Sequence, residues 1–277
     1  MKAAAPGRTT MEFYGRVLRE LLDDGSIDRG FRTLVVCGGM LDRDTLLAAG
    51  FCDVTISNLD ARTQGDAYAP FAWSFQDAES LGFPDASFDL AVVHAGLHHC
   101  QSPHRALLEM WRVARRAVLA FESRDSLAMR AACALGLAAR YEVEAVADNG
   151  YRFGGMRNSS IPNYIYRWTE REVRKTIDCA SPHAHHAYRF FYQFRPPTRR
   201  LAMHRSRAVR LAGRVLDLGA GLLEPIAARQ GNLFAFFVRK PSFPDDLHPW
   251  LRLEDGTVVP DRAWCEARLD PGGAVRR

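Results

Sequence analysis

The sequence predicts an α/β fold built on a doubly wound, mostly parallel sheet with helices on both faces. Two observations support this prediction. Short apolar runs alternate with stretches of helical spacing through the first half of the chain. The run at 88–94 is apolar on both faces, as a buried parallel strand requires.

Several elements of the first half follow from these patterns. The predicted helices cover 11–22, 42–49 and 103–113. The predicted strands cover 33–37, 54–57, 71–75, 88–94 and 117–122. Right-handed crossovers between parallel strands then fix most of the topology.

The second half is less regular. A helix is expected over 126–146, a loop over 148–166, and a second helix over 168–177. Thr169 is a plausible N-cap for that second helix, and Glu172 stands at capping-box spacing from it. Strands are expected over 188–194 and 233–239.

No internal repeat and no low-complexity linker divides the chain. We therefore expect one domain over 1–277, with a Rossmann-like core at about 30–125. A helical and loop lid with the remaining strands would occupy about 126–240, and an irregular tail 241–277.

The composition restricts the class of protein. The chain has 277 residues, of which 47% are hydrophobic and 25% charged, and this is ordinary for a globular protein. No run approaches the roughly 20 apolar residues of a membrane helix, and the N-terminus lacks the apolar segment of a signal peptide. Six scattered cysteines without a C-x-x-C pair favour a reducing cytosol. These features predict a cytoplasmic protein without a membrane span.

Much of the net charge of +5 lies between Arg195 and Arg214. This basic stretch is either a solvated helix face or a surface for an anionic partner such as a phosphate or sugar nucleotide. Aromatic residues are not interleaved with the basic ones as a stacking platform would need, so a nucleic-acid partner is not favoured.

The turn after the first predicted strand is a candidate ligand site. In a doubly wound sheet, ligands bind at the carboxyl ends of the strands. Gly38 and Gly39, after Cys37, would let backbone approach a ligand that side chains would block. Many tight turns carry paired glycines, so the pair alone does not define the site.

Polar residues follow the next two predicted strands. Asn58 and Asp60 stand about 20 residues after Gly39, where a side chain can accept hydrogen bonds from ribose hydroxyls. They can equally well serve only to terminate the strand. Asp77, after the third strand, could accept from an adenine amino group.

A longer motif carries a family resemblance. Residues 77–89 read D-A-E-S-L-G-F-P-D-A-S-F-D, and Leu97-His98-His99 follow. The segment from Leu34 to Glu122 thereby resembles the class I S-adenosylmethionine-dependent methyltransferases, most closely the type 11 group. Gly82 stands where that group usually has proline, and the turn at Gly38 lacks the usual G-x-G-x-G.

The resemblance implies S-adenosylmethionine as cofactor and assigns its contacts. Cys37, Gly38 and Gly39 would line the methionine side. Asn58 or Asp60 would bind the ribose, and Asp77 with Ala78 the adenine. His94 and Ala95 would close the pocket from the fourth strand.

Two histidines after the fourth strand are the catalytic candidates. His98 or His99 would lie near the transferred methyl and could take a proton from an acceptor hydroxyl. Alternatively, they pack against the cofactor or cap the following helix. The spacings of the nine histidines match no known metal site, so no metal is expected.

The loop in the second half is the candidate acceptor site. Residues 157–170 loosely resemble methyltransferases of cell-surface polysaccharide biosynthesis. Their donors, acceptors and aromatic faces suit a sugar-binding lid, or alternatively an Ω-type loop buried by its own aromatics. The acceptor-binding candidates are Arg157, Asn158, Asn163, Tyr164 and Tyr166.

The expected activity is methyl transfer to a hydroxyl of a small-molecule or glycan acceptor. A nicotinamide oxidoreductase and a non-catalytic relative are the alternatives. The first would require G-x-G-x-x-G after the first strand, and the sequence lacks this motif there. A second glycine string at 214–221 matches the family turn better. Too little chain follows it to supply the other strands, so we interpret it as a helix or helix end.

Overall fold

The computed structural model describes residues 8–63, 65–194, 206–207, 210–211 and 228–268. The second glycine string at 214–221 lies outside these residues, as does most of the basic stretch from Arg195 to Arg214. No helix of the described part is long and apolar enough to cross a membrane.

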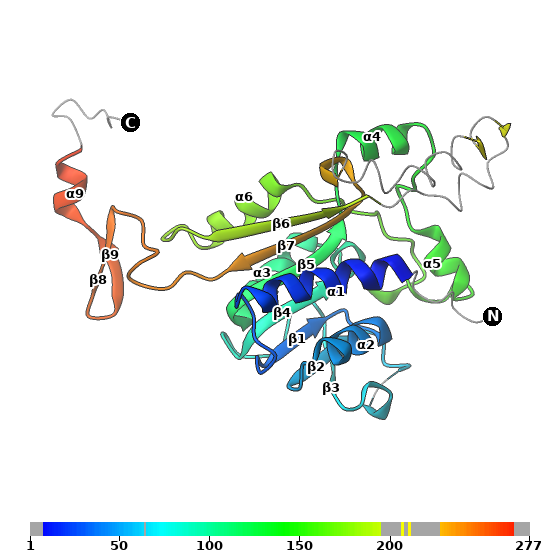
Figure 1. The fold of residues 1–277 in the computed structure, drawn as a ribbon, viewed down its shortest axis with the longest axis horizontal. Helices are drawn as coiled ribbons and strands as arrows, with labels where there is room; N and C mark the ends of the chain where they lie inside the picture. Colours follow the sequence, from blue (N-terminus) through cyan, green and yellow to red (C-terminus); the bar gives the residue numbers. More distant parts are fainter. Residues whose placement is uncertain (1–7, 64, 195–205, 208–209, 212–227, 269–277) are drawn as a thin grey trace.

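A seven-stranded sheet forms the centre of the molecule and confirms the predicted fold class (Figure 1). Its strand order is β3-β2-β1-β4-β5-β7-β6. The first five strands in this order are parallel, and β7 runs antiparallel to both of its neighbours. The strands are β1 (Thr33–Val36), β2 (Val54–Asn58), β3 (Ala72–Phe75), β4 (Phe88–His94), β5 (Ala114–Ser123), β6 (Ala187–Gln193) and β7 (Leu233–Arg239).

Helices cover both faces of the sheet. One face packs against α1 (Arg8–Asp23) and α2 (Met40–Ala49), which contribute Val17, Leu21 and Leu46 to the core. The other packs against α3 (Pro103–Val113) and α6 (Glu170–Ala180). The central strands β4 and β5 are buried between these layers because their side chains are apolar on both faces.

The segment between β5 and α6 differs from the prediction. The helix expected over 126–146 is two helices, α4 (Leu127–Ala134) and α5 (Val143–Asp148). The chain leaves the helical path near Gly136, which takes a φ of 72° that only glycine adopts without strain. The capping box of Thr169 and Glu172 at the start of α6 is confirmed, with the Thr169 hydroxyl and the Glu172 carboxylate each accepting from the other's backbone N–H.

The tail is more ordered than expected. Residues 241–277 were predicted to be irregular, but β8 (Leu251–Glu254) pairs with β9 (Thr257–Pro260) in a hairpin, and α9 (Arg262–Glu266) follows. Asp255 and Gly256 form the hairpin turn with positive φ, the Asp-Gly signal of a tight hairpin. This hairpin lies beyond one end of the sheet, whereas α4 and α5 lie at the end toward which β1 runs (Figure 1).

Candidate functional site

A pocket opens at the carboxyl ends of the parallel strands. Its floor comes from the residues that follow β1 to β4, and part of the segment 142–163, here called the lid, completes its lining. The floor residues are Cys37, Asn58, Leu59, Asp60, Arg62, Gln76, Asp77, Ala78, Glu79, Ala95, Gly96, His99 and Cys100. The lid contributes Asn149, Gly154, Gly155, Arg157 and Asn158.

Most of the cofactor-binding candidates from the sequence meet in this one pocket. The strand ends bring together Cys37, Asn58, Asp60, Asp77, Ala78 and Ala95, and the lid adds Arg157 and Asn158. The remaining candidates lie outside its lining, namely Gly38, Gly39, His94, His98, Asn163, Tyr164 and Tyr166.

Gly38 in the turn after β1 is required by close packing. A Cβ on Gly38 would lie 2.6 Å from a methyl of Val35 and 2.8 Å from one of Ile56, so Gly38 lets the chain pass closely over β1 and β2. A Cβ on Gly39 would meet nothing within 4 Å, and its N–H is bound by the Asp42 carboxylate at 2.9 Å. Cys37 is therefore the residue of this turn that lines the pocket.

Asn58 and Asp60 have different roles at the end of β2. The Asn58 amide donates to the carbonyl of Gly38 at 2.9 Å and accepts the N–H of Asp60 at 3.0 Å, so it fixes the turn. A hydrogen bond from Arg62 lowers the pKa of the Asp60 carboxyl. Asp60 is thus the ionised acceptor that remains at this strand end.

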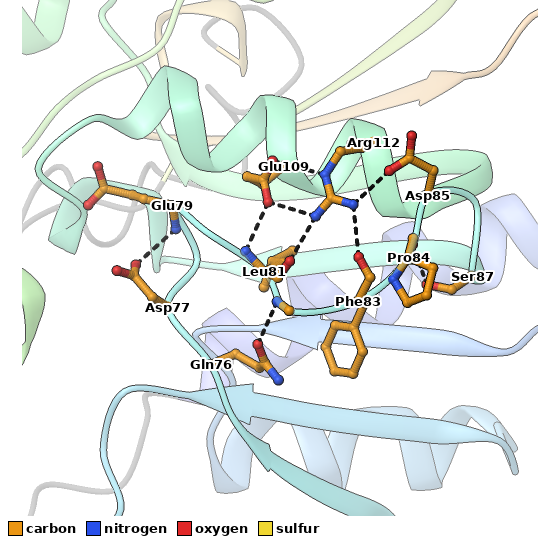
Figure 2. Close-up of polar contacts among 11 residues, drawn as sticks. Gln76, Asp77, Glu79, Leu81, Phe83, Pro84, Asp85, Ser87, Glu109 and Arg112 are labelled. Carbon is orange, nitrogen blue, oxygen red and sulfur yellow. Dashed lines mark hydrogen bonds and ion pairs between the residues drawn. The ribbon is translucent and has the colours of Figure 1, made fainter.

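The residues after β3 form a clamped loop (Figure 2). Leu81 N–H donates to Glu109 at 2.9 Å, and the Arg112 guanidinium donates to the carbonyls of Leu81 and Phe83 at 2.8 Å each. Both clamping residues come from α3 and were not singled out from the sequence. They explain the long motif at 77–89, since its first three residues line the pocket. Leu81, Phe83 and Asp85 in its middle bind to α3.

Asp77 is the floor residue that meets the lid. One of its oxygens accepts the N–H of Glu79 at 2.9 Å, and the other pairs with Arg157 at 2.7 Å. The buried Glu79 carboxylate accepts the N–H groups of Gln101 and Ser102, both at 2.9 Å, at the start of α3. The orientation of Asp77 is therefore set from both floor and lid.

His94 does not close the pocket as expected. Its ring stacks on Tyr14 of α1, with centroids 5.1 Å apart and planes 3° apart. Burial lowers the pKa of His94 to about 4. As the last residue of β4 it faces the layer of α1, because side chains alternate along a strand and its neighbour Ala95 takes the pocket position.

His98 is buried between two carboxylates. Its Nδ1 lies 2.8 Å from Glu122 of β5, and its Nε2 lies 3.3 Å from Glu142 of the lid. Burial opposes protonation, but Glu122 and Glu142 outweigh it and raise the pKa of His98 to about 10. The expectation that His98 takes a proton from the acceptor is not supported by this geometry, since both ring nitrogens already face carboxylates.

His99 is the histidine that reaches the pocket. Its Nε2 lies 3.3 Å from the same Glu142 oxygen. Burial and the neighbouring His98 lower the pKa of His99. Of the two catalytic candidates, His99 is therefore the one with access to a bound ligand.

The remaining lid candidates act within the lid or beside it. Asn163 is buried and donates to Glu142 at 3.3 Å. Tyr164 packs edge-on against Tyr141, and Tyr166 donates to Glu172 at 2.6 Å. Both tyrosines line a second hollow, together with Asp125, Met129, Arg130, Cys133, Arg140, Arg167 and Glu172. The five acceptor-binding candidates therefore do not share one surface.

One comparison with known proteins matches the segment that supplies the floor of the pocket. Residues 37–121 match the model of a methyltransferase domain family, so the matched segment runs from the turn after β1 to β5. The comparison with curated proteins found no match.

Several solved structures align with this chain. Magnesium protoporphyrin IX methyltransferase from Synechocystis PCC 6803, with bound SAH, aligns with a TM-score of 0.51 at 13% identity, covering 87% of this chain and 90% of that one. A SAM-dependent methyltransferase from Thermotoga maritima, a possible histamine N-methyltransferase, gives 0.48 at 12% identity, covering 84% and 92%. The 1,6-didemethyltoxoflavin-N1-methyltransferase of Burkholderia thailandensis gives 0.48 at 16% identity, covering 84% and 79%.

Residues 37–121 therefore match a methyltransferase domain, and the sheet that contains them has a Rossmann-like fold. The family match indicates S-adenosylmethionine as the cofactor and sets aside the nicotinamide alternative.

Proposed function

We propose that this protein transfers a methyl group from S-adenosylmethionine to a hydroxyl of a small-molecule or sugar-containing acceptor. One observation carries the proposal. The segment that matches the methyltransferase family supplies the floor of a lidded pocket, and His99 lies in that same pocket. Binding pockets of doubly wound folds lie at this edge of the sheet.

The residues of the pocket fit the proposed cofactor. A nucleoside bearing hydroxyl and amino groups needs acceptors, and Asp60 and Asp77 supply carboxylates at the ends of β2 and β3. We assign Asp60 to the ribose and Asp77 with Ala78 to the adenine. Cys37, Ala95 and Gly96, at the ends of β1 and β4, would hold the methionine part.

The bound cofactor would supply an electrophilic methyl carbon on a sulfonium. In the proposed transfer the acceptor oxygen would bond to this carbon as the carbon–sulfur bond breaks with its electron pair left on sulfur, and His99 would accept the hydroxyl proton. The chain would contribute alignment and limit the access of water, since residues of the segment 149–158 line the pocket together with the floor. His99 is the residue that we assign to the acceptor hydroxyl.

The preference for an oxygen acceptor rests on this histidine. A hydroxyl needs help to lose its proton, whereas a neutral amine can attack without it. Arg157 and Asn158 line the pocket from the lid and are the residues that we expect to contact the acceptor. All six cysteines are free, which supports the cytoplasmic location that we also propose.

Calorimetric titration with S-adenosylhomocysteine tests the cofactor assignment. We expect one site per chain, with weaker binding in Asp60→Ala and unchanged binding in the control Asp44→Ala, an exposed residue of α2 that pairs with Arg43. Absence of binding by the unmodified protein would overturn the proposal. Formation of S-adenosylhomocysteine with matched alcohol and amine acceptors would then test the preference for oxygen.

A further inference from the structure

Three side chains at the edge of the pocket gather potential metal-binding atoms. His98 and His99 each offer a ring nitrogen and Glu142 a carboxylate oxygen, and these atoms lie within 4.8 Å of one another. The histidines belong to the short 3-10 helix η2 (Leu97–His99) after β4, and Glu142 precedes α5 in the lid. Sheet and lid thus meet at this cluster.

The distances in the cluster suit ligands better than hydrogen bonds. Nε2 of His98 and Nε2 of His99 both lie 3.3 Å from the same oxygen of Glu142. A hydrogen bond between imidazolium and carboxylate is normally about 2.7–2.9 Å long. Two ligands held about 2.0–2.1 Å from one metal ion are separated by roughly 2.8–3.0 Å at octahedral angles and by roughly 3.3–3.4 Å at tetrahedral angles, and the separations of 3.3 Å fit the tetrahedral case.

The surroundings resemble the outer shell of a metal site. Metal-binding histidines usually direct their second ring nitrogen to a carboxylate or carbonyl. Nδ1 of His98 lies 2.8 Å from Glu122, whose other oxygen accepts the N–H of Leu97 at 2.7 Å. Glu142 is held in turn by the amide of Asn163 at 3.3 Å. Two of the three potential ligands are therefore oriented by a further residue.

The two histidine rings are also mutually aligned. Their centroids are 4.6 Å apart and their planes differ by 36°, so the two adjacent residues direct their rings to the same side of η2. His98 is enclosed by the fold, whereas His99 borders the pocket. A cation held here would have its open coordination positions on the pocket side.

We propose that His98, His99 and Glu142 bind a divalent first-row transition metal ion such as Zn²⁺ or Fe²⁺. Two imidazoles and one carboxylate are a common ligand set for these ions, and they leave positions open for a further oxygen. Binding displaces the Nε2 proton of His98, as metal ions displace protons from their ligands. This assignment revises the sequence expectation of no metal.

The consequence for catalysis rests on the proposed function. An acceptor hydroxyl that occupies an open position loses its proton to water more readily, because the cation stabilises the oxygen anion. His99 would then act on the acceptor as a metal ligand. The cation would also tie the lid to the floor.

Metal binding can be measured without any acceptor. The protein is freed of metal by dialysis against a chelator and titrated with Co²⁺, followed by its visible d–d absorption, and then with Zn²⁺ in competition. We expect one ion per chain. Glu122→Gln should weaken binding by roughly 10–100-fold, and His99→Gln and Glu142→Gln by more.

A second histidine group supplies the control. Nδ1 of His248 lies 3.1 Å from Nε2 of His185, far along the chain from the pocket residues, so His185→Gln should leave the stoichiometry and affinity unchanged. The proposal is overturned if Co²⁺ does not bind, or if His99→Gln and Glu142→Gln bind it as the unmodified protein does. Titration of the metal-free protein with S-adenosylhomocysteine separates this failure from a failure of the proposed function.

Discussion

The floor and the lid of the pocket are built in different ways. The floor consists of the ends of adjacent parallel strands, so backbone hydrogen bonds of the sheet determine where Asn58, Asp77 and Ala95 lie. The lid is attached by side chains, through the pair of Arg157 with Asp77 and the contact of Glu142 with His98 and His99. The difference teaches that strand order brings the floor residues close together, whereas the lid depends entirely on particular partners distant in sequence.

The largest expected effect concerns a buried carboxyl group behind the turn that follows β1. Asp42 lies in α2 behind the turn, beside the Tyr14 hydroxyl, and burial raises its pKa to about 7. The folded state therefore holds a proton that the unfolded state has lost above pH 4, so stability falls as the pH rises from about 4 to 7. Asp42→Asn should remove this fall and stabilise the protein at pH 8 by at most about 4 kcal/mol.

Urea unfolding of both forms between pH 4 and pH 8 measures this effect. At the acidic end the two curves should nearly coincide, because the Asp42 carboxyl is then neutral in the folded state. Parallel pH profiles for the two proteins would show that Asp42 is not the responsible group.

The next effect breaks the lid and leaves the floor intact. A Cβ on Gly155 would lie 1.9 Å from the carbonyl oxygen of Ile161, which the lid backbone cannot accommodate in its present path. We expect Gly155→Ala to cost about 3 kcal/mol. Residues 149–163 should lose protection in hydrogen exchange, while β1 to β5 should keep theirs.

Gly39→Ala is the matched variant in the turn after β1, beside the floor. Its Cβ would meet nothing within 4 Å, and its φ of −141° suits any residue. Its melting temperature should equal that of the unmodified protein within a degree or two. If Gly39→Ala were the more damaging change, the contrast between floor and lid would be wrong.

A smaller effect separates the two roles of Asp77. If its carboxylate binds the cofactor, Asp77→Asn should weaken S-adenosylhomocysteine binding by roughly 10–100-fold, the usual value of a hydrogen bond to a charged group. Calorimetry at one pH and ionic strength is sufficient to measure this. An unchanged affinity would show that Asp77 does not bind the cofactor and only contacts the lid.

The smallest effect is expected for the lid partner of Asp77. The side chain of Arg157 is 44% exposed, and ion pairs of this kind contribute about 0–1 kcal/mol. Arg157→Ala should therefore change affinity less than about fivefold, mostly through faster ligand exchange. Equal losses in Asp77→Asn and Arg157→Ala would mean that Asp77 acts only through the lid.

Sequence patterns predicted the floor because alternation of strands and helices fixes which residues end adjacent strands. They did not predict that Cys37 lines the pocket while Gly38 and Gly39 do not. This arrangement depends on the close packing of Gly38 against Val35 and Ile56. Nor could they pair His98 with Glu122 and Glu142, which come from β5 and from the lid. Spacing within one segment carries no information about such tertiary partners.

Two residues of the floor adopt a backbone conformation that their side chains disfavour. Cys37 has a φ of 54° and Ala95 a φ of 52°, and they follow the adjacent strands β1 and β4. Each left-handed residue with a side chain costs roughly 1–2 kcal/mol relative to relaxed backbone, so the pocket stores conformational energy at its centre. The surrounding sheet supports this local strain, and the same rigidity holds two pocket-lining side chains at fixed directions before any ligand arrives.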